Sequence, residues 1–252
     1  MNSALEILIK DKISRIKIIK IIKETAELMD IEVYAVGGFV RDIILDRARN
    51  DLDILVIGSG IDFARKVAEA LKINDVAYYK NFGTAHFDFE NMNIEFVGAR
   101  KESYDRNTRK PIVEDGTFKE DIYRRDFTIN TLAISLVKDE FGKLIDTFGG
   151  IEDIKNKLIK TPLDPFKTFE DDPLRIMRAF RFASQLNFNV DPGIMIAASK
   201  MRERLTIVSQ ERITDEFLKI LESPKPSIGL QLLFNSSVLE IVFPEIYIMA
   251  GV

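Results

Sequence analysis

The pattern of apolar residues divides the chain into two parts. In the first part, short apolar runs rich in β-branched residues are separated by Gly and Asn turns and predict strands. The predicted strands are residues 33–36, 54–57, 76–79, 84–89, 94–97 and 132–137, with a helix at 62–71. Strands mixed with helices indicate an α/β or α+β domain.

From about residue 163 the pattern changes to helices alone. Apolar residues at helical spacing predict helices at 173–186, 192–201, 211–221 and 227–235, separated by Asn, Pro and Ser. We therefore expect a boundary near residue 160, with one domain over 1–160 and an all-helical domain over 161–252.

The N-terminal segment is rich in isoleucine, and Lys17, Lys20 and Lys23 interrupt the run. This spacing predicts an opening amphipathic helix that covers a sheet and turns its lysines outward. The segment has neither the cleavage site of a signal peptide nor the uninterrupted apolar length of a membrane span. We expect a cytoplasmic protein without a membrane partner.

Composition narrows the classes of protein and site. The chain has 252 residues, 46% hydrophobic and 30% charged, which is typical of a globular protein with its own core. The net charge of -4 means that contacts with nucleic acid must come from local basic clusters. The absence of cysteine excludes disulfides and thiolate metal sites, and the single histidine, His86, is expected to pack in its strand. Motifs of a P-loop or a hydrolase triad are missing.

A double glycine follows the first predicted strand. Gly37 and Gly38 allow a positive φ and a close approach to a ligand, because no Cβ stands in the way. A helix is expected to begin at Phe39, with Arg41 in its first turn. The free N–H groups and partial positive charge of a helix start favour phosphate oxygens.

Two aspartates lie on the next predicted strand. Asp51 and Asp53 are two positions apart, so both carboxylates point to one face, which Leu55 and Ile57 continue into an apolar core. Oxygen ligands of this kind suit Mg²⁺, and two such ions could clamp the attacking and leaving oxygens of an in-line displacement. Because either motif alone is more often an ordinary turn or strand end, the interpretation depends on their combination.

Two further groups of polar residues are candidates. Ile94 and Glu95 are neighbours on a predicted strand, so their side chains point to opposite faces. Glu95 could be a third carboxylate if its strand pairs with that of Asp53. An exposed surface glutamate fits the pattern equally well. The second group contains two neighbouring arginines. Arginine binds phosphate with two parallel hydrogen bonds, so this group could bind a phosphate. The alternative is a helix end with surface ion pairs. This group is Arg124, Arg125, Asp126 and Asn130.

An acidic pair precedes the first helix of the second part. Asp172 as N-cap with Pro173 at the first helical position is a good helix start without catalytic meaning. Asp172 can also lie beside Arg175, where a carboxylate and a guanidinium could read the edge of a base. Both roles are compatible. Asp171 belongs to the same cluster, which continues to Arg178 and Arg181.

The segment 100–117 has no apolar period and mixes both charges, which predicts a mobile loop. Long loops are solvated connections or functional segments, and the pattern alone does not separate the two.

In this order, the motifs resemble those of the tRNA nucleotidyltransferase and bacterial poly(A) polymerase family, the class II CCA-adding enzymes of the polymerase β superfamily. The resemblance covers nearly the whole chain. It implies an α+β fold: a polymerase β-like nucleotidyltransferase head with a mixed β-sheet and helices, followed by an all-α neck. Residues 212–245 resemble the end of that neck, beyond which the family has helical body and tail domains, and the sequence ends at Val252.

The resemblance also implies roles for residues. Asp51 and Asp53 match the catalytic, metal-holding carboxylates, and Glu95 matches a further acidic residue of the catalytic set. Asp42 belongs to the first motif, and residues 146–150 resemble the hinge between head and neck. Asp171 stands where the family usually has Glu. The implied nucleotide-binding residues are Gly37, Gly38, Arg41, Arg124, Arg125, Asp126, Asn130, Asp171, Asp172, Arg175, Arg178 and Arg181.

The implied activity is template-independent addition of C and A from CTP and ATP to the 3′ end of tRNA, with Mg²⁺ as cofactor and pyrophosphate as product. The loop from Arg100 onward would permit the switch from C to A. A poly(A) polymerase, or an enzyme that adds only C or only A, would share these motifs. The oligomeric state is not indicated.

Two other classes of function are less favoured. A catalytically silent RNA-binding module has no reason to keep the clustered charges of Asp51 and Asp53, which cost stability without a metal. A nucleotidyltransferase that modifies a small molecule or a protein would leave the base-reading pair of Asp172 and Arg175 without a purpose.

Overall fold

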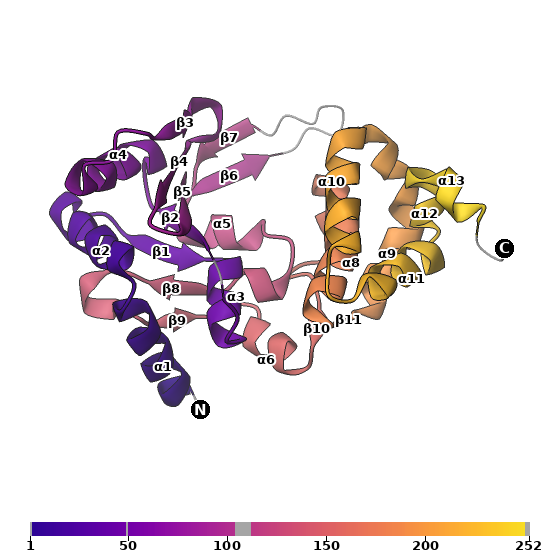
Figure 1. Ribbon diagram of the computed structural model, residues 1–252, viewed down its shortest axis with the longest axis horizontal. Coiled ribbons are helices and arrows are strands. Elements are labelled where there is room, and N and C mark those ends of the chain that lie inside the picture. The colour runs from indigo at the N-terminus through magenta and orange to yellow at the C-terminus, as the bar shows by residue number, and fades with distance from the viewer. Residues whose placement is uncertain (1, 49, 104–111, 250–252) are drawn as a thin grey trace. The chain divides into compact units, whose positions relative to one another are not determined.

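The structure is a computed structural model that describes residues 2–48, 50–103 and 112–249 (Figure 1). It divides into two compact units: Met1–Arg125 with Ile129–Gly150, and Asp126–Thr128 with Ile151–Val252. Residues 126–128 belong to the second unit because Phe127 packs edge-on against Phe182 and the Thr128 N–H donates to the Lys160 carbonyl. We call these the sheet unit and the helical unit.

The sheet unit is built on a mixed β-sheet, as the sequence predicted. The described residues form a seven-stranded sheet in the order β3-β4-β5-β2-β1-β8-β9, in which β2 and β5 are parallel and the other neighbours antiparallel. The six predicted strands are all present. The strands are β1 (Val33–Val36), β2 (Asp51–Val56), β3 (Ala77–Tyr79), β4 (Thr84–Phe89), β5 (Met92–Gly98), β8 (Ala133–Ser135) and β9 (Leu144–Ile145).

Helices complete the core of the sheet unit. On one face, Leu55 packs in a buried cluster with Tyr34 and with Ile122 of α5 (Phe118–Tyr123). The helix α4 (Gly60–Leu71) buries Phe63, whose ring lies 5.9 Å from that of Phe96 on β5. The predicted helix at 62–71 is therefore confirmed, with two additional residues at its start.

The N-terminal isoleucine run forms two helices rather than the single one expected. They are α1 (Asn2–Ser14) and α2 (Lys17–Met29), and they separate at Ile16, whose backbone is extended. The helix α2 buries Ile18, Ile19 and Ile22 and packs against α4. Lys17 and Lys20 are exposed, which confirms the outward direction predicted for them.

The prediction of a loop across residues 100–117 was wrong at its ends. The strands β6 (Arg100–Ser103) and β7 (Ile112–Asp115) pair antiparallel, and residues 104–111 between them lie outside the described residues. The strands were missed because β6 carries charged residues at neighbouring positions and so lacks an apolar alternation.

The helical unit contains all four helices predicted for it. They are α8 (Leu174–Leu186), α9 (Pro192–Met201), α10 (Gln210–Leu221) and α11 (Pro226–Asn235), with α8 packed against α10 and α11. The close approach of α11 to α8 requires Gly229, because a Cβ added there would collide with Ser184 Oγ of α8. Shorter elements are α6 (Gly150–Lys155), α7 (Pro165–Asp171), α12 (Val238–Val242), α13 (Pro244–Tyr247) and the parallel pair β10 (Leu158–Ile159) and β11 (Asn189–Val190).

The division after Gly150 precedes the boundary expected near residue 160. The intervening segment includes β10, which joins the helical unit by pairing with β11. The assignment of the two units to a catalytic head and a base-reading neck stays a prediction. Within the described residues, no helix is long and apolar enough to cross a membrane.

Candidate active site

A glycine turn joins β1 to α3 (Gly38–Ile44). Gly37 has φ +71°, as a turn of this kind requires, and α3 begins at Gly38, one residue earlier than expected. A Cβ built on Gly37 would lie 3.1 Å from Arg125 Nη1 and 3.5 Å from Asp53 Oδ2. The missing side chain therefore lets the turn approach a carboxylate and a guanidinium at once.

Three carboxylates lie on one face of the sheet beside this turn. Asp51 is exposed and Asp53 half-buried, and they alternate with the fully buried Leu52 on β2. Asp53 pairs with Val36 on one side and with Glu95 on the other, so the sheet places Asp53 and Glu95 on the same face. The strand pairing that would make Glu95 a third carboxylate is therefore present. We call Asp51, Asp53 and Glu95 the acidic face.

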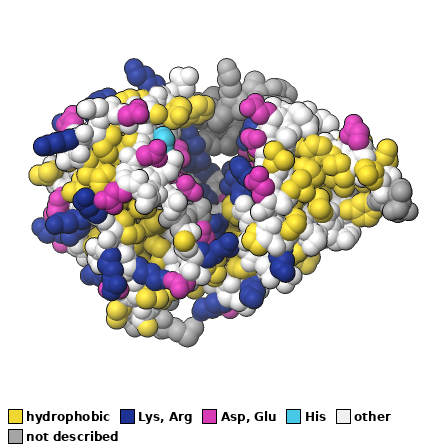
Figure 2. Space-filling view, viewed as in Figure 1, with side chains coloured by type: hydrophobic (Ala, Val, Ile, Leu, Met, Phe, Trp, Pro, Cys, Tyr) yellow, Lys and Arg dark blue, Asp and Glu magenta, His cyan; other side chains and the backbone are white. Residues whose placement is uncertain are grey.

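Glu95 lies in an environment that opposes its charge. Glu95 is an exposed residue, so the alternative of a surface glutamate also fits the structure. Partial burial of its carboxyl still raises the pKa of Glu95, and the nearby carboxylate of Asp53 raises it further, while His86 and Arg100 act in the opposite direction. His86 lies directly across from Glu95 on β4, as expected of a histidine packed in its strand. Its side chain is 30% exposed, with Nε2 3.7 Å from Asp88 Oδ1, and Figure 2 shows it in cyan at the surface.

The acidic face fits a cation that takes part of its ligands from a substrate. Among the described residues, no group of three or more His, Cys, Asp or Glu side chains could hold a metal ion without help. Mg²⁺ is commonly bound by one or two carboxylates together with waters and substrate phosphates. Asp51 and Asp53 offer two carboxylates on one accessible face, so their chemistry matches that arrangement.

A buried aspartate orients the two arginines that follow α5. Asp121 is 0% exposed, and it accepts hydrogen bonds from Arg124 on Oδ1 and from Arg125 on Oδ2, the latter at 3.0 Å. Both guanidinium groups keep about a fifth of their side-chain surface exposed. The sequence prediction did not include Asp121, although its spacing of three and four residues from the arginines could have revealed it.

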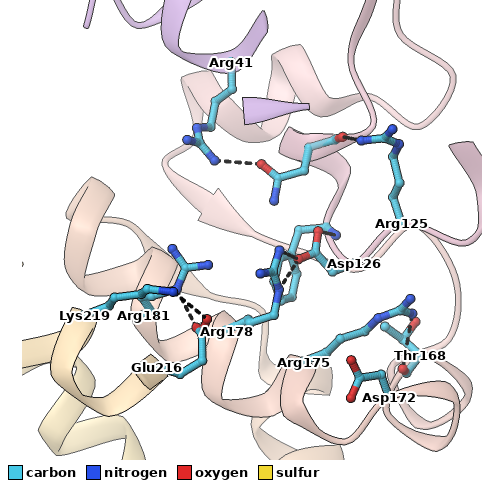
Figure 3. A network of polar contacts seen from close by, with 12 residues as sticks. Arg41, Arg125, Asp126, Thr168, Asp172, Arg175, Arg178, Arg181, Glu216 and Lys219 are labelled. Atoms are coloured by element: carbon cyan, nitrogen blue, oxygen red, sulfur yellow. Dashed lines mark hydrogen bonds and ion pairs between the residues drawn. The ribbon is translucent and has the colours of Figure 1, made fainter. Parts of the chain in front are cut away.

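Arg41 and Asn130 form part of a buried network. Arg41 is 3% exposed, and its Nε and Nη2 donate to the Asp42 carboxylate at 2.8 and 3.1 Å. Its Nη1 donates to Asn130 Oδ1 at 2.7 Å. Figure 3 labels Arg41 and marks this hydrogen bond with a dashed line. The sequence placed Arg41 at a helix start but gave no sign of its contact with Asn130, which lies far away along the chain. Their nucleotide-binding role stays a prediction.

Asp126 and Arg178 form an ion pair in the helical unit. Asp126 accepts the Phe127 N–H on Oδ1, and on Oδ2 it accepts Arg178 Nε at 2.8 Å and Nη2 at 2.6 Å. Asp126 is the main reason that the pKa of Arg178 is raised. The structure thus brings together two residues that the sequence had assigned to separate motifs.

Arg181 pairs with a buried glutamate (Figure 3). Its Nε lies 2.5 Å from Glu216 Oε2, its Nη1 donates to Gln185, and its guanidinium lies 4.1 Å from the centroid of the Phe182 ring. Burial lowers the pKa of Arg181, and the charge of Glu216 opposes this effect. Sequence reasoning missed Glu216, because nothing in its helical spacing connects α10 with α8.

Asp172 has partners on both carboxylate oxygens. The prediction that Asp172 is the N-cap of α8 was wrong by one residue, because Pro173 holds that position and α8 begins at Leu174. Oδ1 of Asp172 still accepts the Leu174 N–H at 3.1 Å. Its Oδ2 accepts Nη2 of Arg212 at 3.1 Å. Arg175 Nη1 lies 3.4 Å from the Thr168 carbonyl (both residues are labelled in Figure 3), and Asp171 is the last residue of α7.

The family model described as the poly A polymerase head domain matches residues 33–160, which is more than half of the chain. The chain belongs to this family. A second family model, described as a probable RNA- and SrmB-binding site of polymerase A, matches residues 187–249 of this chain.

Known proteins with similar sequences and structures point to the same family. An A-adding tRNA nucleotidyltransferase of Aquifex aeolicus is 39% identical over 76% of this chain and 24% of its own length. A CCA-adding enzyme of Lactobacillus helveticus is 35% identical over 86% of this chain and 53% of its own. A crystal structure of a tRNA nucleotidyltransferase complexed with a primer tRNA and an incoming ATP analog is 34% identical, with TM-score 0.75, over 88% of this chain and 62% of that one.

These matches confirm the resemblance that the motifs carry and the expected fold, a polymerase β-like head followed by a helical region. The chain spans about half or less of the length of the two curated relatives.

Replacement of Asp121 tests its role in orienting the arginines. Asp121→Asn removes the charge between two guanidinium groups, and we expect a loss of about 2–3 kcal/mol in the free energy of unfolding, as for broken charged hydrogen bonds. Urea denaturation measures this loss. The matched control is Asp62→Asn, because the exposed Asp62 also precedes its arginine, Arg65, by three residues and should change stability by no more than about 1 kcal/mol. Equal losses in both variants would contradict the orienting role.

The raised pKa of Glu95 predicts a dependence of stability on pH. A carboxyl whose pKa is higher in the folded state contributes stability below its ordinary pKa, and this contribution is lost as pH rises through the folded pKa. Without divalent cations, Glu95→Gln should therefore be more stable than the wild type at pH 7.5, and the difference should shrink toward pH 4. Thermal unfolding across this range measures it, and a difference that grows on acidification would contradict the assigned direction.

Proposed function

We propose that this chain is a template-independent RNA nucleotidyltransferase that adds C and A from CTP and ATP to the 3′ end of tRNA and releases pyrophosphate. The observation that carries this proposal is the acidic face beside the Gly37 turn, in a member of the poly A polymerase head-domain family. Relatives named A-adding and CCA-adding support the substrate class.

Asp51 and Asp53 are the residues that would hold Mg²⁺. When bound, the metal lowers the pKa of the attacking hydroxyl and neutralises charge on the triphosphate. Asp53 lies close enough to Gly37 for the glycine turn to bring its backbone against the same substrate phosphates. Glu95 adds negative charge to this face, and a bound cation would remove the cost of keeping it ionised.

Arg124 and Arg125 are suited to hold the triphosphate of the nucleotide. Asp121 fixes both guanidinium groups, so little side-chain freedom remains to be lost when a phosphate binds. Arg125 also lies beside the Gly37 turn, which the carboxylate of Asp53 borders as well.

Asp172 and Arg175 are the residues that would select the base. Cytosine and adenine both carry an exocyclic amino group, which donates a hydrogen bond, where uracil and guanine carry a carbonyl, which accepts one. A carboxylate such as Asp172 accepts from an amino group and has nothing to donate to a carbonyl. Selection for C and A over U and G follows from this chemistry.

An enzyme that adds only the terminal A is the second candidate, because one of the relatives described above is named A-adding. The motifs are compatible with both activities. The nucleotide that each RNA substrate accepts distinguishes them, as does the number of residues added.

The test uses two tRNA transcripts, one without its CCA end and one that ends in CC, each incubated with Mg²⁺ and either CTP or ATP. We expect two C residues to be added to the first transcript and a single A to the second, as resolved on a sequencing gel. Addition of A alone would favour the A-adding candidate, and a long A tail would favour a poly(A) polymerase. The absence of incorporation with either transcript at saturating RNA would overturn the proposed activity.

Asp53→Ala tests the role of the acidic face in the same assay. Loss of a charged group on which transition-state stabilisation depends should lower the rate at least about 100-fold. Circular dichroism should show an unchanged fold. Asp62→Ala removes an exposed carboxylate from α4 and should keep wild-type activity. Full activity of Asp53→Ala would contradict the assignment.

A further inference from the structure

Arg212 contacts the carboxylate that the proposed function assigns to base selection. Its Nη2 donates to Asp172 Oδ2 at 3.1 Å across 40 residues of sequence. The other oxygen, Oδ1, accepts the Leu174 N–H at 3.1 Å. Each oxygen of Asp172 thus has a donor from a different element, the start of α10 on one side and the start of α8 on the other.

Stability does not explain this position of Arg212. The side chain of Arg212 is 52% exposed and that of Asp172 28%, and an ion pair so open to water contributes only about 0–1 kcal/mol to folding. Arg212 also lies in the first turn of α10, where the partial positive charge of the helix start disfavours a cation. An arginine at this position calls for a reason other than helix stability.

The two donors define the plane of the Asp172 carboxylate. The last torsion of an aspartate is broad and two-fold, so a single hydrogen bond from the Leu174 N–H would leave the carboxylate plane free to tilt. Arg212 removes that freedom. An ionised carboxylate has about four acceptor positions, so two remain for a ligand after Leu174 and Arg212 have taken theirs.

We propose that Arg212 is a positioning residue for base selection, which holds the Asp172 carboxylate in the orientation that accepts the exocyclic amino group of cytosine or adenine. This inference rests on the proposed function, because it assigns a partner to the residue that reads the base. Arg212 acts through Asp172 and need not touch the nucleotide itself.

The contact between Arg212 and Asp172 predicts a specific effect on the choice between CTP and UTP. A carboxylate held in one plane gains a well-aligned hydrogen bond with the amino group of CTP, whereas the carbonyl of UTP at the same place gains none. Loss of Arg212 should therefore weaken CTP binding more than UTP binding. A general phosphate-binding role would instead weaken both equally, because the two triphosphates are identical.

The experiment measures equilibrium binding of CTP and UTP, each with Mg²⁺, by isothermal titration calorimetry on the 252-residue chain. For Arg212→Ala we expect the ratio of CTP affinity to UTP affinity to fall about tenfold, which corresponds to the loss of one charge-assisted hydrogen bond. Arg212→Lys keeps the charge and a donor and should recover part of the ratio. The melting temperature should stay within about 2 °C of wild type, because the pair is exposed.

The matched control is Arg65→Ala, because the side chain of Arg65 is also 52% exposed and also pairs with an aspartate, Asp62 of the same helix. Its affinity ratio should stay at the wild-type value. An unchanged ratio in Arg212→Ala, or an equal loss of affinity for both nucleotides, would overturn the positioning role while the proposed function stands. A wild-type chain that does not prefer CTP to UTP would overturn the base-selection part of the proposed function, and this inference with it.

Discussion

The parallel register between β2 and β5 is the constraint on which the candidate site depends. It pairs Asp53 with Glu95, and the antiparallel register of β1 and β2 places Val36, the last residue before the Gly37 turn, on the other side of Asp53. A shift of β2 by one residue would turn the aspartates into the core and bring the buried Leu52 to the surface. The hydrophobic residues that fix the register therefore also fix where the charges stand.

In each unit, two arginines are held by internal carboxylates rather than left to solvent. Asp121 holds Arg124 and Arg125, and in the helical unit Asp126 and Glu216 hold Arg178 and Arg181. Removing such charges from water is costly, and the pairs recover that cost only with good geometry. The consequence for function is orientation, because a guanidinium already fixed in place loses little freedom when it binds an anion.

Local patterns in the sequence were enough to predict six of the seven strands described in the large sheet, the four long helices of the helical unit and the common face of Asp51 and Asp53. The position of Asp172 at the start of α8 could be predicted to within one residue, because it depends on residues close together in the sequence. The contacts of Arg212 and Glu216 could not be predicted, since they join segments that no periodicity connects. The strands β6 and β7 were missed because charged residues conceal their alternation.

On the proposed function, the acidic face gathers divalent cations together with a nucleoside triphosphate. The most direct measurement is Mn²⁺ binding by electron paramagnetic resonance, with and without a non-hydrolysable CTP analogue, in the wild type and in Asp53→Asn. We expect the nucleotide to strengthen Mn²⁺ binding to the wild type, Mg²⁺ to compete with it, and Asp53→Asn to lose this effect. Mn²⁺ binding that is equally strong in both proteins, or that does not change when the nucleotide is added, would contradict the role of the acidic face.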